Sequence, residues 1–370
     1  MNGLLKAVAV VALVGFVACS AVKADDSIHY YEQGTKRLVT IEGKIRSESA
    51  AGISIKPGLG AAREVPAADV DDVDYEMSGG PRLDYKRASL SEKAADQLTK
   101  EDERKKALET ALKAYKGLLD ELTEAKVKRH IHFKIARLTA RLAESDLSQA
   151  KTAVKLLKAF TKNNPDTWQF TACSRLLAGL QTANQDYEGA QKTYEELAKT
   201  PGIPAAMKQD SELKVAEMMV KAKKYGQAKE KLQDLAKAVQ ADDPQAVRLN
   251  ISLAECQAAE GDLTKATQAL EGLIAKPMSK ALKAQAYNAL GDCYYGKKKW
   301  KDAMWNYLYV DVVYHQDREE HAKALYYLSK VFKELGDDKK ATEYRDRLEK
   351  DKQFAGLEYQ KLLLLEKSGS

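Results

Sequence analysis

The sequence predicts a mainly helical protein, in which an α-solenoid of about six to seven stacked helix pairs follows a small antiparallel β barrel or sheet. Two observations predict the solenoid. Proline is scarce, at 8 of 370 residues, while strong helix formers abound, and a small residue recurs at a nearly constant spacing. A third observation predicts the β module, because residues 29–75 alternate between apolar and polar side chains. The hydrophobic fraction of 44% and the charged fraction of 31% exclude a disordered chain.

The first 24 residues are typical of an export signal. Lys6 precedes an apolar stretch of 16 residues, 7–22, which only Ser20 interrupts, and the small residues Val22 and Ala24 mark a cleavage site. The stretch is shorter than the roughly 20 residues of a bilayer-spanning helix. We therefore expect an exported chain, which is periplasmic, held in the cell envelope or secreted, and we expect no nucleic-acid partner.

Two alternatives stay open for this segment. It could remain uncleaved as an N-terminal membrane anchor, or Cys19 could receive a lipid after cleavage. Lipid attachment sites resemble Leu-(Ala/Ser)-(Gly/Ala)-Cys, whereas Phe16-Val17-Ala18 precede Cys19 here, so the Phe departs from that pattern. Both alternatives imply peripheral membrane anchoring through the N-terminus.

The remaining cysteines are Cys173, Cys256 and Cys293, and they lie at least 37 residues apart. This spacing fits neither a disulfide framework nor a metal site. We expect them to be small buried residues of helices. The sequence predicts no cofactor and no metal site.

Residues 25–80 are predicted to form the β module. The segment 38–45 alternates and is rich in β-branched residues, and shorter runs around Ile53, Val65 and Val73 follow it after turns that contain Gly or Pro. This order of elements resembles an SH3-like or Sm-like small barrel. The resemblance implies peptide binding or, for the Sm-like case, RNA binding, while a capping or docking module is the plainer interpretation. Gly79-Gly80 place the module boundary at residue 80.

Residues 86–350 are predicted to form the helical repeats. A small residue recurs every 37–40 positions, and bulky residues mostly stand three places before it and four places after it. The small residue lets two antiparallel helices approach closely, and the bulky residues fill the space one turn to either side. Turn signals such as Pro201-Gly202 and Gly261-Asp262 separate the expected helices. The small residues are Ala150, Ala190, Ala228, Ala266, Ala303 and Ala341.

One unit, residues 284–307, carries a recognisable motif. The pattern Trp-x2-Leu-Gly-x2-Tyr … Ala-x3-Phe is matched at Leu290-Gly291, Tyr294 and Ala303, with Tyr287 and Tyr307 at the Trp and Phe places. The unit therefore resembles the tetratricopeptide repeat (TPR). The spacing of 37–40 residues is longer than the 34 that are usual for this family.

The resemblance implies a protein or peptide partner in a concave groove lined by the first helix of each pair. Lysines of the last unit resemble the cations that hold a peptide carboxylate in some members, although the clamp motif is incomplete. Tyr295, Trp305 and Tyr326 are expected to be exposed, and Tyr294 and Tyr307 are expected in the core. The candidate partner-binding residues are Arg248, Asn288, Asp292, Tyr295, Lys323, Tyr326 and Lys330.

Residues 351–370 are predicted to form a capping helix and tail. The run from Leu362 to Leu365 is more apolar than a solvent-facing terminal helix requires. We expect it either to cover the last repeat or to dock on a partner or a second copy.

The sequence carries no Gly-x-Ser-x-Gly, His-Glu-x-x-His or phosphate-binding motif. His130 and His132 are two places apart in a helical segment and so point to different faces. We expect a non-enzymatic, extracytoplasmic scaffold for protein–protein interaction, with cell-envelope assembly as its setting. The alternative is a self-associating structural envelope protein or a lipoprotein. It is motivated by charge, since residues 25–85 hold 7 basic and 12 acidic residues and the chain from residue 86 has a net charge of +9.

Overall fold

The computed structural model describes residues 26–32, 35, 37–77, 81–145, 147–240 and 243–368. The expected signal segment with Cys19 and the boundary residues Gly79-Gly80 lie outside this part of the chain. The helices are α1 (Pro81–Gln97), α2 (Glu101–Leu118), α3 (Ala125–Ser145), α4 (Ala150–Asn163), α5 (Gln169–Ala183), α6 (Tyr187–Lys199), α7 (Ala205–Lys221), α8 (Tyr225–Ala236), α9 (Pro244–Ala259), α10 (Leu263–Ile274), α11 (Lys280–Gly296), α12 (Trp300–Val313), α13 (Arg318–Glu334), α14 (Asp338–Lys350) and α15 (Glu358–Ser368).

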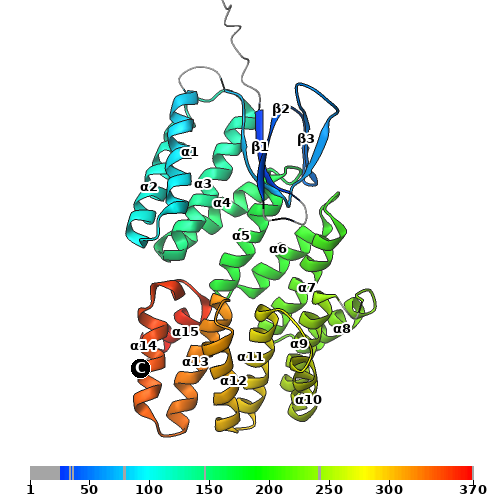
Figure 1. The fold of residues 1–370 in the computed structure, drawn as a ribbon, viewed down its shortest axis with the longest axis vertical. Helices are drawn as coiled ribbons and strands as arrows, with labels where there is room; N and C mark the ends of the chain where they lie inside the picture. The colour runs from blue at the N-terminus through cyan, green and yellow to red at the C-terminus, as the bar shows by residue number, and fades with distance from the viewer. Residues whose placement is uncertain are drawn as a thin grey trace, which may run out of the picture.

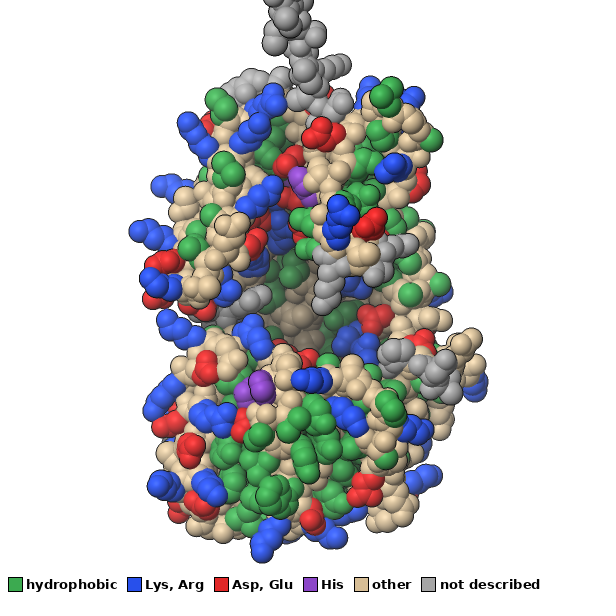
Figure 2. Space-filling model, viewed as in Figure 1, with side chains coloured by type: hydrophobic (Ala, Val, Ile, Leu, Met, Phe, Trp, Pro, Cys, Tyr) green, Lys and Arg blue, Asp and Glu red, His purple; other side chains and the backbone are tan. Residues whose placement is uncertain are grey.

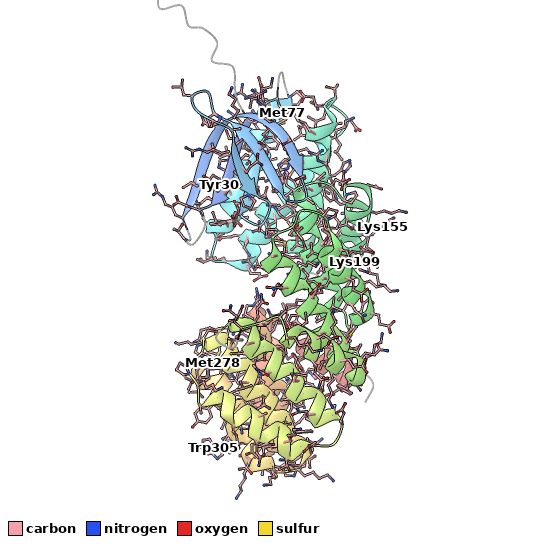
Figure 3. All side chains as sticks on the ribbon, turned by 90° about the vertical axis from the view of Figure 1, so that its right-hand side faces the viewer. Tyr30, Met77, Lys155, Lys199, Met278 and Trp305 are labelled. Atoms are coloured by element: carbon pink, nitrogen blue, oxygen red, sulfur yellow. The ribbon has the colours of Figure 1, made fainter. Side chains whose placement is uncertain are left out.

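The helices form seven antiparallel pairs, from α1/α2 to α13/α14, and α15 follows the last pair. Figure 1 shows the strands beside α1–α4 at one end of the molecule, α9–α15 at the other end, and α5–α8 between them. In Figure 3 the middle of the chain is set back toward the side that carries Lys155 and Lys199, so a recess opens on the opposite side. The predicted solenoid of six to seven helix pairs is confirmed.

A five-stranded antiparallel sheet precedes the helices. Its strands are β1 (Asp26–Tyr31), β2 (Leu38–Ser49), β3 (Gly52–Lys56), β4 (Arg63–Pro66) and β5 (Val70–Asp74), in the order β4-β3-β2-β1-β5. The long β2 pairs with β1 through its first half and with β3 through its second half. At Gly43, where the partner changes, a Cβ would lie 2.3 Å from the carbonyl oxygen of Lys56, so glycine permits the bend. The predicted β module is therefore a curled open sheet whose edges are β4 and β5.

The sheet and the first helices share one hydrophobic core. Ile28 and Val73 of the sheet belong to the same buried cluster as Ile131 of α3. The indole nitrogen of Trp168, just before α5, donates a hydrogen bond of 3.1 Å to the hydroxyl of Tyr75, just after β5. The sheet therefore covers the N-terminal end of the helical array as part of its core.

A buried ion network also joins the sheet to α1 and α3. The ammonium of Lys134 donates to the carboxylate of Asp72 and, over 3.0 Å, to that of Glu92, and all three side chains are buried. Arg137 donates to the second oxygen of Glu92, and His130 lies 3.4 Å from Asp72. Burying these charges is tolerable because each carboxylate faces cations.

The predicted small residues of the repeats lie where two helices of a pair approach each other. Five of the six alanines are buried, and Ala341 is half-buried. In the TPR-like unit, Gly291 has the same role, since a Cβ there would lie 2.6 Å from the ring of the buried Tyr307.

Cys173, Cys256 and Cys293 are buried and unpaired, as predicted.

The turns within five successive pairs repeat one backbone conformation. The second residue before α6, α8, α10, α12 and α14 has a positive φ, and the next residue is the N-cap of the following helix. Two turns use glycine there, followed by an aspartate that caps the helix, as in Gly261-Asp262. The turn before α12 uses Lys298, with φ 56°, and Lys299, which makes no side-chain cap.

Replacing Lys298 by Gly and Lys299 by Asp is expected to stabilise the chain by about 1–2 kcal/mol, because glycine removes the strain of a Cβ at positive φ and Asp supplies the missing cap. The midpoint and slope of urea unfolding measure this gain. The matched control replaces Lys298 by Ala and Lys299 by Glu, since this lowers the net charge by the same three units but keeps the Cβ at positive φ and supplies no favoured N-cap residue. A similar gain in that control would show that charge, not the backbone and the cap, causes the effect.

Candidate partner-binding surface

The first helices of successive pairs contact one another, as α7 does with α9, α9 with α11, and α11 with α13. Helices that lie this close form the concave side of a curved repeat array. The predicted residues come from these helices.

Arg248 of α9 is held by α7. Its guanidinium donates to Asp210 over 2.7 Å and to Glu217 over 2.7 and 3.1 Å. Lys214 donates to the other oxygen of Glu217 over 2.7 Å. The chain's own carboxylates thus occupy the donors of Arg248, and this network fixes α7 to α9.

Asn288, Asp292 and Lys323 come together between α11 and α13. The side-chain amide of Asn288 donates to the carbonyl and the carboxylate of Glu320 over 2.9 and 2.7 Å, and its own carbonyl oxygen is buried without a hydrogen-bond partner. Asp292 accepts from the hydroxyl of Tyr307 over 2.7 Å and pairs with Lys323 over 2.7 Å. The side-chain oxygen of Asn288 is therefore a buried hydrogen-bond acceptor without a donor.

Burial and charge shift the ionisation of this cluster. Burial alone would lower the pKa of Lys323, but the nearby carboxylates, led by Asp292, raise it well above the ordinary lysine value. Burial, which Lys323 only partly opposes, raises the pKa of Glu255 on α9 to about 7, and Asp292 and Glu320 add to this rise. The concave side therefore holds a carboxyl group that titrates near neutrality.

Glu255→Gln is expected to stabilise the chain above neutral pH and to leave it unchanged near pH 4. The folded chain keeps the proton of Glu255 up to about pH 7, whereas the unfolded chain releases it near the ordinary glutamate pKa of 4.5. The free energy of unfolding therefore falls as the pH rises from about 4.5 to about 7, and it stays at the lower level at higher pH. A glutamine has no proton to release, so at about pH 8 the variant gains about 1–2 kcal/mol, discounted because Glu255 is only half-buried.

Urea unfolding of both chains at the two pH values measures the difference. Glu230→Gln, at an exposed position of α8, is the control and should show no pH-dependent gain. An equal gain at both pH values would show that folding does not raise the pKa of Glu255.

The C-terminal helix α15 covers Tyr326 and Lys330 on α13. The hydroxyl of Tyr326 donates to Glu366 over 2.6 Å, and Lys330 lies 2.8 Å from the same carboxylate and 4.5 Å from the centre of the tyrosine ring. Tyr326 is only 7% exposed, so the expectation of an exposed tyrosine was wrong. The sequence did not show that α15 folds back over this residue.

The other end of α15 reaches the middle of the chain. Glu358 accepts hydrogen bonds from the hydroxyl of Tyr187 at the start of α6 and from Lys221 at the end of α7, over 2.6 and 2.5 Å. Lys361 donates to Asn184 in the turn between α5 and α6 over 2.7 Å. These contacts, which sequence reasoning missed, close the concave side of α7–α13 into a ring. Figure 2 shows the hollow left between this ring and the end that carries the sheet.

The aromatic residues that were predicted to be exposed differ in how exposed they are in the structure. Tyr295 is half-buried, with its ring packed edge-on against Trp300 and Tyr327, so it does not present an open face to a ligand. Trp305 is 60% exposed, as expected, but it lies on the second helix of its pair, away from the charged cluster. Tyr307 is buried, as predicted.

Two cavities adjoin α7 where it packs against α6, α8 and α9. One, of about 580 Å³, lies against α6 and α8, and the other, of about 260 Å³, lies against α8 and α9. Lys208 and Glu212 line both, and neither contains any of the seven predicted residues. The predicted residues lie outside both cavities, on a polar surface that contacts α7, α13 and α15.

No helix among the residues that the structure describes combines the length and apolar character that crossing a membrane demands. Among them, no three His, Cys, Asp or Glu side chains gather as metal ligands. His130 is buried and His132 is exposed, which agrees with their expected opposite orientations.

No protein-family model matches the sequence, and no curated protein does. Solved structures match in fold. A tetratricopeptide repeat protein from Parabacteroides merdae ATCC 43184 has a TM-score of 0.54 and 14% identity over 76% of this chain and 99% of its own. The apo form of RapI has a TM-score of 0.50 and 14% identity over 75% of this chain and 78% of its own. In fold, the chain is thus a TPR-like α-solenoid with a five-stranded antiparallel sheet at its N-terminal end.

Proposed function

We propose that the protein is an exported, non-enzymatic scaffold that binds a protein or peptide partner on the concave side of its first helices. The observation that carries this proposal is that α15 packs against the concave side of the chain's own helices. The first helices already hold α15, through Lys221 of α7 at one end and Tyr326 and Lys330 of α13 at the other. Tyr187, at the start of the second helix α6, adds a hydrogen bond beside Lys221. A surface that holds one helix by paired cations and tyrosines can bind a partner segment of the same chemistry.

The alternative of self-association through opposite charges is less well supported. The acidic sheet has its basic partners within the same chain, because Glu48 pairs with Arg129, Asp72 with Lys134, and Asp26 with Lys126. These pairs neutralise, within the same chain, three of the 12 acidic residues of segment 25–85 that would attract the basic helices of a second copy.

Export is proposed from residues 1–24, with the cell envelope as the place of action. Mass spectrometry of the chain isolated from fractionated cells tests it. The expected result is a mature chain that begins at Asp25 in the extracytoplasmic fraction. A chain that retains residues 1–24 in the cytoplasmic fraction would refute the proposal.

The binding surface is tested by cross-linking the tagged full chain in envelope extract and identifying the captured partners by mass. We compare the parent with a variant in which Arg248, Lys323 and Lys330 are replaced by Gln. A matched control carries Gln at Lys192, Lys199 and Lys237, three exposed lysines of second helices and the loop after α8. Thermal unfolding confirms that both variants fold.

The proposal expects a partner that the parent and the control capture and the concave-side variant loses. Equal capture by all three chains would show that the partner binds elsewhere.

A further inference from the structure

The outer face of α12 carries an exposed apolar stripe. Trp305 is 60% exposed, Tyr309 48%, Val312 67% and Val313 42%. Their spacing of four, seven and eight residues places them on one side of the helix. Figure 2 shows a continuous hydrophobic area over the lower half of the molecule, and in Figure 3 Trp305 points outward on the side that also carries Met278.

The other second helices do not share this stripe. When α6, α8, α10 and α14 are aligned with α12 by their first residues, the positions of Trp305, Tyr309 and Val312 hold exposed charged, polar or small residues. Packing of the solenoid therefore does not require apolar residues there. The aligned residues are Lys192, Glu196 and Lys199; Glu230, Asp234 and Lys237; Gln268, Gly272 and Ala275; and Glu343, Arg347 and Lys350.

Packed aromatics hold the stripe in place from beneath. The ring of Tyr287 on α11 stacks on Tyr309 at 4.9 Å between ring centroids and on Tyr314 at 5.5 Å. Such stacks fix the rings of Tyr309 and Tyr314 relative to α11. The stripe is therefore a preformed surface that loses little freedom when it is covered.

Lysines lie at both ends of the α11–α12 hairpin. Residues 276–302 contain seven lysines and two aspartates, and one of these, Asp292, is paired with Lys323 on the concave side. Lys276 and Lys280 lie at the start of α11, and the exposed Lys298, Lys299 and Lys301 lie around the start of α12. An antiparallel second copy would bring these like charges together, so the charges disfavour self-pairing here.

We propose that this face, the α12 surface, docks on an anionic phospholipid bilayer. Tryptophan and tyrosine favour the boundary between headgroups and acyl chains, and each lysine near an anionic surface adds roughly fivefold to binding. The four exposed side chains offer roughly 400 Å² of apolar surface, which is about half of what one partner of a stable protein interface buries. That area suits shallow, reversible insertion of side chains better than a protein interface.

Fluorescence of the full chain on vesicles tests this proposal. The chain has three tryptophans, of which Trp168 is buried and Trp300 half-buried. Brominated acyl chains quench only indoles that enter the bilayer. We therefore expect quenching on vesicles of equal parts phosphatidylglycerol and brominated phosphatidylcholine, and its loss in Trp305→Phe. The parent and the variant keep the same N-terminal segment, so binding through residues 1–24 does not contribute to the difference.

Charge variants complete the test. Replacing Lys298, Lys299 and Lys301 by Gln is expected to raise the lipid concentration for half-maximal Trp305 quenching on the order of a hundredfold at low salt. The same change at Lys192, Lys199 and Lys237 is the control and should have little effect. Thermal unfolding confirms that every variant folds.

Three results would overturn the proposal. One is quenching that persists in Trp305→Phe, and another is equal Trp305-dependent quenching on vesicles of phosphatidylcholine alone. The third is dimerisation without lipid: the mass of the parent chain doubles as its concentration rises, while the Trp305→Gln variant stays monomeric. In that case a second copy, not a bilayer, covers the α12 surface.

Discussion

Lys134→Met is expected to lower the free energy of unfolding by about 3–5 kcal/mol, because it leaves Asp72 and Glu92 buried without their shared cation. Methionine fills nearly the same volume, so the loss measures charge rather than a cavity. Urea unfolding gives its size. Lys100→Met is the matched control, because Lys100 and Glu103 form an exposed pair, and its expected cost is below about 0.5 kcal/mol.

The pH dependence of the same variant separates charge from packing. Burial opposes ionisation of Glu92, but Lys134 and Arg137 outweigh it and lower its pKa to about 2, and the pKa of Asp72 is also lowered. The stabilisation from these lowered values is present above the unfolded pKa values near 4 and is lost as the pH falls toward 2. We expect a weaker loss over this window in Lys134→Met. An unchanged acid limb together with a small cost at neutral pH would show that the network is not ionised.

Gly291→Ala is expected to destabilise the chain by about 2–3 kcal/mol, toward the upper part of the range for overpacking. Three ring atoms of the buried Tyr307 would lie 2.6 to 2.9 Å from the new Cβ, and this ring is held by its hydrogen bond to Asp292. Thermal or urea unfolding measures the loss.

Gly272→Ala is the matched control, because nothing lies within 4 Å of a Cβ there. It should stabilise the chain by about 0.5–1 kcal/mol through helix propensity. Gly291→Ala combined with Tyr307→Leu should cost less than the sum of the two single changes. Additive losses would mean that the ring moves aside freely.

The repeated part of the fold was predictable because every unit needs a small residue where its two helices cross, so the same sequence pattern recurs. The small residue at the helix crossing and the turns at nearly regular spacing predict six to seven pairs, and the described residues form seven. Tyr307 and the three cysteines are buried as expected. The candidate site was less predictable. Asn288, Asp292 and Lys323 do come together, but whether they accept a partner stays a prediction.

Contacts between distant segments left no local pattern to find. Lys134 meets Asp72 across 62 residues, and α15 covers Tyr326 through Glu366. The apolar run from Leu362 to Leu365 predicted that this segment would cover the last repeat or dock on a partner or a second copy. In the structure α15 packs on α13 and α14 of the last pair, but the sequence did not indicate its further contacts with α5–α7. A comparison of equivalent positions in the second helices could have found the α12 surface, because only α12 has large apolar residues where α6, α8, α10 and α14 have charged, polar or small ones.

The contacts of α15 with α5–α7 have a consequence for how the chain folds. In an open solenoid nearly all contacts are local, so the array can fray from its ends one repeat at a time. Here Glu358 and Lys361 reach back across 137 to 177 residues, which raises the contact order of an otherwise local topology. Closing so long a loop is slow and entropically costly, so docking of α15 should come late in folding. Once docked, it couples the last repeat to the middle of the array, and α5–α15 should unfold in one cooperative transition rather than by fraying from the C-terminal end.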